Sequence, residues 1–287
     1  MDTLTSLFDE DIRPETQTIS FPTIGECFTV ESVNKQNQHI SDAVSTILWG
    51  GATLLCNYMI TVKDIFRHRP TLELGCGVGL PGILATKLGA SFCCVSDSDD
   101  SPVFTELMEK NLHRNLHNIS VAETSNQTTY TNCVFNKVVW NERTHLLPQL
   151  SSLFLQKPCS LCDESGQDPR QALDVVPKSL IVLCSDVIYY HTDVASLAHT
   201  IAFYLNKSKE LTPPDEPKPV CIMCNLSARF AHAEEPFKEI LESTGILLLR
   251  QWRADSDGVE APEKKDDEVL TVYQSRYPYV FLEMSPT

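Results

Sequence analysis

The sequence predicts an α/β fold in which a mostly parallel sheet is covered by helices on both faces. Two observations lead to this prediction. Apolar segments of strand length alternate with helix-compatible segments from residue 71 to residue 244, and the glycine cluster ELGCGVGLPG, at 73–82, overlaps the end of the first strand. The strands are apolar throughout, as is typical of strands buried on both faces. These features indicate a doubly wound sheet with a ligand site at its first strand-to-helix turn.

The expected elements follow one another in the order that such a sheet requires. Apolar spacing predicts a helix from Val44 to about Met59, weakened by Gly50 and Gly51 and packed beside the first strand. Strands are expected at 71–75, 92–96, 118–122, 134–140, 180–186 and 220–225, and helices at 81–88, 102–116, 193–206 and 234–244. The segments GILLLRQW (245–252) and YVFLEM (279–284) are expected to close the sheet as an antiparallel pair.

Three segments rich in proline, glycine and charged residues interrupt this order, at 156–178, 206–219 and 254–268. We expect them to be loops inserted between core elements. No shift in composition marks a domain boundary. The prediction is therefore a single domain over 44–287, preceded by a variable N-terminal segment, 1–43.

Composition restricts the environment and the partners. The chain carries 23 basic and 38 acidic residues, a formal net charge of −15, and lacks the basic patch that a nucleic acid requires; a basic protein surface is the better electrostatic match. No stretch approaches the roughly 20 apolar residues of a membrane span, and the first residues lack the pattern of a secretory signal. Eleven cysteines scattered through apolar segments indicate reduced thiols, so we expect a cytoplasmic location, which does not exclude the nucleus. The oligomeric state stays open.

Two Cys-x-x-Cys pairs raise the question of a structural zinc ion. They are Cys159 with Cys162, and Cys221 with Cys224. The second pair lies in an expected strand, where residues three apart point to opposite faces of the sheet. We therefore expect no metal site.

The glycine cluster fits two ligand templates. Gly77, Gly79 and Gly82 match G-x-G-x-x-G, and Asp97 follows Gly77 by 20 residues, about where a nicotinamide-binding fold keeps the acid for its ribose. In both templates the missing Cβ lets the backbone take positive φ and lets a ligand approach closely.

The second template, E-x-G-x-G-x-G, is the usual form of S-adenosylmethionine sites. Glu73, Gly75, Gly77 and Gly79 match it. The two ligands differ in charge, because a dinucleotide brings a pyrophosphate whereas S-adenosylmethionine brings an ammonium group that favours a carboxylate. Glu73 could serve the part of the site that binds this ammonium group, either by direct contact or by shaping the site.

Further residues in the same order distinguish the templates. Trp49 precedes Gly75 by 26 residues, Trp140 stands at the end of an expected strand in VVWNE, and Asp186 and Tyr189 form a D-x-x-Y pattern in SDVIYY. With LELGCGVGLPGILATKLGA and Asp97, these residues resemble, over roughly 44–252, the class I (seven-β-strand) S-adenosylmethionine-dependent methyltransferases, and in particular the lysine methyltransferases of methyltransferase family 16.

The resemblance implies a Rossmann-like doubly wound sheet of seven strands, mostly parallel with a closing antiparallel strand, and S-adenosyl-L-methionine as cofactor. Asp97 would hold the ribose hydroxyls and Trp140 would lie near the adenine. The implied cofactor-binding residues are Trp49, Glu73, Gly75, Cys76, Gly77, Gly79, Asp97, Trp140 and Ser185.

Asp186 and Tyr189 are the expected catalytic residues. A lysine amine, with a solution pKa of about 10.4, must be neutral to accept a methyl group. Asp186 would accept a hydrogen bond from this amine and aim it, while Tyr189 would wall the channel. Asp97 and Asp186 could instead cap the helices that follow them, and the tryptophans could be core. Arg229 is expected at the same sheet edge, more readily paired with a surface acid than in contact with substrate.

The leading hypothesis is therefore a protein-lysine N-methyltransferase with a protein substrate. Methyl transfer to arginine, histidine or a small amine is the first alternative. A cofactor-binding adaptor without turnover and a NAD-dependent dehydrogenase are the others.

Overall fold

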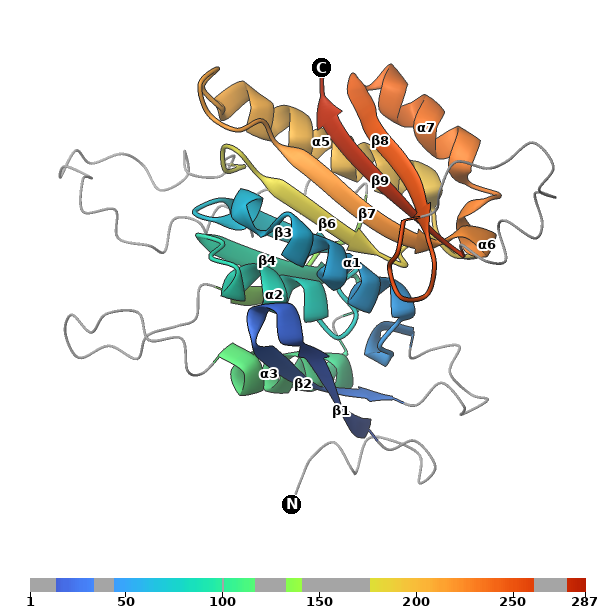
Figure 1. The fold of residues 1–287 in the computed structure, drawn as a ribbon. Helices are drawn as coiled ribbons and strands as arrows, with labels where there is room; N and C mark the ends of the chain where they lie inside the picture. Colours follow the sequence, from blue (N-terminus) through green and yellow to red (C-terminus); the bar gives the residue numbers. More distant parts are fainter. Residues whose placement is uncertain (1–13, 34–43, 100, 117–132, 141–175, 261–277) are drawn as a thin grey trace.

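A seven-stranded sheet forms the centre of the molecule (Figure 1). The computed structural model describes residues 14–33, 44–99, 101–116, 133–140, 176–260 and 278–287. The strand order is β5-β4-β3-β6-β7-β9-β8, and only β9 runs against the others, antiparallel to both β7 and β8. The strands are β3 (Pro70–Leu74), β4 (Phe92–Asp97), β5 (Cys133–Lys137), β6 (Ile181–Ser185), β7 (Val220–Leu226), β8 (Ile246–Ala254) and β9 (Tyr279–Pro286). The predicted fold class and its closing antiparallel strand are confirmed.

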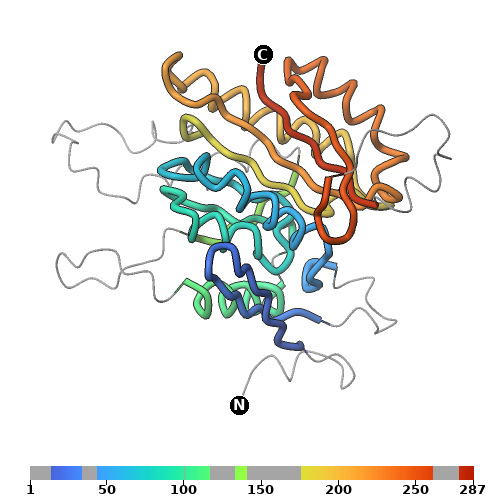
Figure 2. The backbone as a smooth tube through the Cα atoms, viewed as in Figure 1, coloured from blue at the N-terminus to red at the C-terminus, as the bar shows by residue number. Residues whose placement is uncertain are grey.

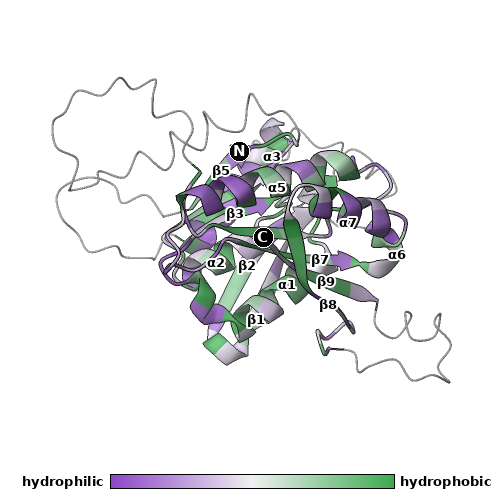
Figure 3. Ribbon diagram, turned by 90° about the horizontal axis from the view of Figure 1, so that it is seen from above, coloured by the Kyte–Doolittle hydropathy of each residue, from purple (hydrophilic) through white to green (hydrophobic). Residues whose placement is uncertain are grey.

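Helices cover both faces of the sheet. Seen from above, α1 and α2 lie on one side, and α5 and α7 lie on the other, with apolar residues gathered between the layers (Figure 3). The α-helices are α1 (Gly50–Thr61), α2 (Leu80–Lys87), α3 (Pro102–Leu116), α5 (Val194–Leu211), the single turn α6 (Ser227–Phe230) and α7 (Glu234–Ser243). None of the helices in the described ranges has the length and apolar character needed to cross a membrane.

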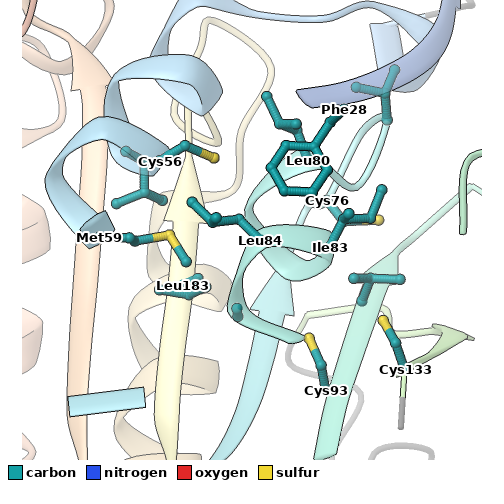
Figure 4. Close-up of a cluster of buried hydrophobic side chains, with 14 of the residues drawn as sticks. Phe28, Cys56, Met59, Cys76, Leu80, Ile83, Leu84, Cys93, Cys133 and Leu183 are labelled. Carbon is teal, nitrogen blue, oxygen red and sulfur yellow. The ribbon is translucent and has the colours of Figure 1, made fainter. Parts of the chain in front are cut away.

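Two hydrophobic clusters explain why the strands are apolar throughout. In β6, Ile181 and Leu183 point into the cluster shared with α1 and α2, whereas Val182 and Cys184 point into the cluster shared with α5 and α7. The first cluster is drawn in Figure 4, where Met59 of α1 and Leu84 of α2 lie beside Leu183. A strand buried on both faces has no polar side to show in its sequence.

Most of the predicted elements lie within a few residues of their expected places, and the helix at 102–116 has the predicted bounds. The strand near 134 ends earlier than expected, at Lys137. The strand expected at 118–122, the segments 156–175 and 261–268, and the pair Cys159 and Cys162 lie outside the described residues. Cys221 and Cys224 of β7 belong to opposite clusters, as the strand geometry predicts.

The first predicted helix begins later than expected. Val44–Thr46 is a separate 3-10 turn, η4, and α1 starts only at Gly50. Trp49 between them has an extended backbone, with φ −87° and ψ 148°. Gly50 and Gly51 are therefore the first two residues of the helix and do not interrupt its middle. The side chains packed against them are described with the candidate site below.

The loop expected at 206–219 is shorter than predicted, because α5 continues to Leu211. Polar residues in the last turns of α5 bond to neighbouring elements. Asn206 Nδ2 donates to the Thr244 carbonyl at 2.9 Å, and the fully buried Ser208 hydroxyl accepts the Leu180 N–H at 3.0 Å. The polar composition of this segment reflects these bonds.

The N-terminal segment contains a hairpin that the sequence analysis missed. β1 (Pro14–Phe21) and β2 (Glu26–Val33) form a separate antiparallel pair, turning at Gly25, whose φ is +70°. The hairpin lies beside α3, about 80 residues further along the chain, as the tube drawing in Figure 2 shows. The alternation in CFTVESV was an available signal for β2.

Candidate functional site

A cavity of about 590 Å³ lies at the carboxyl edge of β3, β4 and β6. In a parallel sheet, the carboxyl ends of the strands meet at one edge, which is where open α/β sheets bind ligands. Eight of the eleven predicted site residues line this cavity: Trp49, Gly75, Gly77, Asp97, Trp140, Ser185, Asp186 and Tyr189. The other three, Glu73, Cys76 and Gly79, are not among its lining residues.

The glycine turn after β3 forms one wall. Gly75 and Gly77 have φ of +64° and +52°, a conformation that side-chain-bearing residues rarely adopt. A Cβ on Gly75 would lie 2.7 Å from Val187 Cγ1 and 3.5 Å from the Trp140 ring. The absent side chains leave room for the residues that enclose the cavity and let a ligand approach the backbone.

Asp97 stands at the end of β4 and fixes the turn. Its Oδ2 accepts the Gly77 N–H at 3.2 Å, and its Oδ1 accepts the N–H groups of Ser98 and Asp99 at 2.8 and 3.3 Å. Burial raises the pKa of Asp97, and these hydrogen bonds oppose the rise. Because a carboxylate has about four acceptor positions, Asp97 keeps one for a ligand hydroxyl. Asp99 accepts the Ser45 hydroxyl at 2.6 Å, which ties η4 to the same rim.

The three predicted residues that do not line the cavity, Glu73, Cys76 and Gly79, are buried at the glycine turn. Glu73 is fully buried, and its Oε2 accepts the Gly82 N–H at 2.8 Å at the start of α2. Cys76 packs its side chain into the hydrophobic cluster, and a Cβ on Gly79 would lie 2.9 Å from Met108 Sδ. Of the two roles expected for Glu73, direct contact with a ligand or shaping of the site, its place off the cavity wall and its bond to Gly82 favour the second.

The Asp186 carboxylate joins three elements. Its Oδ2 accepts the Gly51 N–H of α1 at 2.7 Å, and its Oδ1 accepts the Leu226 N–H at the end of β7 at 2.8 Å. A Cβ on Gly51 would lie 2.6 Å from Asp186 Oδ2, which explains the glycine at this position. Asp186 therefore caps α1, not the helix that follows it, whose N-cap is Asp193. Asp186 still lines the cavity, and the residue is 8% exposed.

Tyr189 is held by a tight turn between β6 and α5. Its N–H donates to Thr192 Oγ1 at 3.0 Å, and the same hydroxyl donates to the Val187 carbonyl at 2.8 Å. Burial is the main cause that raises the pKa of the Tyr189 phenol, and the negative charge of Asp97 adds to it, so the phenol stays neutral. Thr192 also lines the cavity, and the sequence carried no spacing signal that distinguished it.

Arg229 departs from its expected pairing with a surface acid. Its guanidinium lies over the Trp49 ring, 4.4 Å from the centroid, while the Trp49 indole N–H donates to the Val44 carbonyl at 3.1 Å. The Tyr279 hydroxyl lies against Gly50, where a Cβ would come within 2.3 Å of it. Trp49 and the two glycines thus meet side chains from α6, from β9 and from Asp186, which directly follows β6.

The charge of the cavity wall is one-sided. Four aspartates line it, Asp97, Asp99, Asp186 and Asp193, and among the described lining residues there is no lysine or arginine, only His191. Asp99, His191 and Asp193 were not singled out in the sequence. No group of three or more His, Cys, Asp or Glu residues in the described ranges is placed to hold a metal ion. The wall suits an organic ligand that carries positive charge and hydroxyl groups.

The sheet order, the single antiparallel strand and the glycine turn define the fold of a class I methyltransferase. A crystal structure described as a methyltransferase complexed with SAH aligns with a TM-score of 0.51 at 11% identity, covering 95% of this chain and 56% of the other, and thus shares the fold. Residues 31–149 match the model of the lysine methyltransferase family, methyltransferase family 16. The match covers 119 of the 287 residues, and over that part the chain is similar to this family.

Two curated relatives align over more than half of the chain. The protein N-terminal and lysine N-methyltransferase efm7 of Neurospora crassa is 26% identical over 65% of this chain. The histone-arginine methyltransferase METTL23 of Rattus norvegicus is 26% identical over 57% of it. The alignments span 58% and 55% of these relatives' own lengths.

Proposed function

We propose that the chain is an S-adenosylmethionine-dependent protein N-methyltransferase that acts on a lysine side-chain amine. The observation that carries this proposal is the cavity wall, which has four aspartates and, in the described part of the chain, no lysine or arginine. S-adenosylmethionine bears a sulfonium and an ammonium group, which such a wall attracts. NAD bears a pyrophosphate, which the same carboxylates would repel.

The residues present fit this cofactor. Asp97 has an acceptor position free for a ribose hydroxyl, and the Trp140 ring offers an apolar surface for the adenine. The backbone at Gly75 and Gly77 is open to close approach because it lacks side chains. Trp49 closes the side of the cavity nearest α1.

Asp186 and Tyr189 are placed to prepare the acceptor amine. Bound S-adenosylmethionine would supply an electrophilic methyl group. Asp186 uses one acceptor position on each oxygen for a backbone N–H, so two positions remain for hydrogen bonds from an amine. The neutral Tyr189 phenol would wall the channel, and burial there would favour the uncharged amine that can accept a methyl group, its proton having passed to solvent.

The choice of a lysine acceptor rests on the family and on D-x-x-Y. The family model is described as lysine methyltransferase, and the Neurospora relative is named for N-terminal and lysine methylation. The rat relative is named for arginine methylation of histones, which makes an arginine acceptor the second candidate. The net charge of −15 favours a protein substrate with a basic surface.

Incubation of the purified chain with isotopically labelled S-adenosylmethionine and a protein extract from cells lacking the gene tests this proposal. Mass spectrometry of the labelled product then locates the methylated residue. We expect label on lysine. Label on arginine or histidine would contradict the acceptor, and cofactor binding without any transfer would favour the adaptor.

A pair of variants at Tyr189 tests the proposed wall. Tyr189→Phe keeps the ring and Tyr189→Ala removes it, so we expect the first to retain most of the transfer rate and the second to lose roughly tenfold or more. Asp186→Asn should lose transfer while still binding cofactor. Because Asp186 also caps α1, the substitution can destabilise the fold. The methyl-transfer rate of Asp186→Asn is therefore measured under conditions where urea unfolding shows the variant to be folded. Full turnover by Asp186→Asn would contradict the role of Asp186.

A further inference from the structure

Asn111 of α3 is fully buried and bonds to two separate parts of the chain. Its Oδ1 accepts the Glu31 N–H at 2.7 Å, and its Nδ2 donates to the Glu31 carbonyl at 3.1 Å. The same Nδ2 donates to the Val78 carbonyl at 3.2 Å. One amide therefore joins the N-terminal hairpin to the glycine turn.

Asn115, one helical turn later, makes the matching pair of bonds without reaching the turn. Its Oδ1 accepts the Thr29 N–H at 2.8 Å and its Nδ2 donates to the Thr29 carbonyl at 2.9 Å, while its remaining bond is to the Asn111 carbonyl at 2.7 Å. Four residues of helix rise about 6 Å and two residues of strand about 6.6 Å, so both amides reach alternate residues of β2. Together they hydrogen-bond to the backbone N–H and carbonyl groups of Thr29 and Glu31 at the edge of β2, as a third strand would.

Val78 occupies the centre of the glycine turn. It lies between Gly77, which lines the cavity, and Gly79, and both glycines have positive φ. Asp97 holds the turn by accepting the Gly77 N–H, and Asn111 holds the next residue by donating to the Val78 carbonyl. Figure 4 shows a second link, since Phe28 of β2 lies beside Leu80 at the start of α2.

We propose that Asn111 is a positioning residue of the cofactor site, through which docking of the β1–β2 hairpin and cofactor binding at the glycine turn reinforce each other. The inference rests on the proposed function, because it takes S-adenosylmethionine as the ligand of the turn. It makes part of the N-terminal segment, which the sequence predicts to be variable, a support of the site. Since coupling between two sites is reciprocal, the cofactor must stabilise the hairpin as much as the hairpin stabilises the cofactor.

Titration calorimetry with S-adenosylmethionine on Asn111→Leu and Asn115→Leu tests the proposal. Both variants replace an amide by an apolar group of similar size and remove two bonds to β2, but only the first removes the bond to Val78. We expect Asn111→Leu to weaken cofactor binding about three- to tenfold and Asn115→Leu by less than about twofold. Equal weakening, or none, would overturn the role of Asn111. If the unaltered chain does not bind S-adenosylmethionine, the proposed function fails first and this inference fails with it.

Amide hydrogen exchange in the unaltered protein gives a second test that needs no variant. The Glu31 N–H bonds to Asn111 and the Thr29 N–H bonds to Asn115. We expect S-adenosylmethionine to slow exchange at Glu31 more than at Thr29. Equal changes at the two amides, or no change, would overturn the coupling, even if Asn111→Leu did not fold.

Discussion

At Glu73, a carboxyl group lies beneath the glycine turn with one oxygen bonded to the Gly82 N–H and the other, Oε1, without a partner. Burial is the main reason why the pKa of Glu73 lies well above its usual value. The folded protein thus binds a proton here that the unfolded chain releases above a pKa of about 4.3. The group stabilises the fold when protonated and opposes it when charged.

Glu73→Gln should therefore change how stability depends on pH. The contribution of Glu73 is fully present below its unfolded pKa and is lost as pH rises through its folded pKa. Glutamine cannot ionise and keeps a carbonyl oxygen for the Gly82 N–H. Urea unfolding at a series of pH values should show the variant gaining stability relative to the unaltered protein as pH rises from about 4.3. A difference that stays constant with pH would contradict a raised pKa.

At the scale of elements, the start of α1 is set by a residue far away in the sequence. Asp186 lies 135 positions after Gly51, and its carboxylate is held by two backbone N–H groups and cannot easily move. The Tyr279 hydroxyl beside Gly50 is instead the far end of a side chain that can rotate. The two adjacent glycines therefore differ in what surrounds them.

This difference predicts unequal costs for two alanine substitutions. Gly51→Ala places a Cβ against the fixed carboxylate and should lower the free energy of unfolding by about 1–3 kcal/mol. Gly50→Ala should cost less, because the Tyr279 ring can shift. Urea unfolding of both variants measures the contrast, and a Gly51→Ala protein at least as stable as Gly50→Ala would show that the Asp186 cap does not define the helix start.

At the scale of the whole molecule, the parallel strands β3, β4 and β6 bring Gly75, Asp97 and Asp186 to one edge of the sheet. The sequence predicted this edge because each of these residues lies at the end of an expected apolar strand or directly after it. It also predicted that Trp49 and Tyr189 belong to the site, through a resemblance and not through spacing alone.

The features that the sequence did not predict depend on contacts between distant segments. The start of α1 depends on Asp186, and the edge of β2 is completed by Asn111 and Asn115, about 80 residues later. Ser45 and Thr192 line the cavity from η4 and from the turn after β6, which lie far apart in the sequence. The local sequence does not predict bonds between segments that lie far apart in the chain. Strand periodicity and glycine spacing are local patterns, so they can be predicted from the sequence.

Calorimetric titration of the protein with S-adenosylmethionine, and separately with NAD, tests the central claim most directly. The acidic cavity predicts that S-adenosylmethionine binds and NAD does not, and that Asp97→Ala weakens the binding, because it removes both the acceptor for a ribose hydroxyl and the bond that holds Gly77. Binding of NAD without binding of S-adenosylmethionine would contradict the account. The glycine turn would then serve a dinucleotide, and Asp186 would have to be reinterpreted as part of a hydride-transfer site.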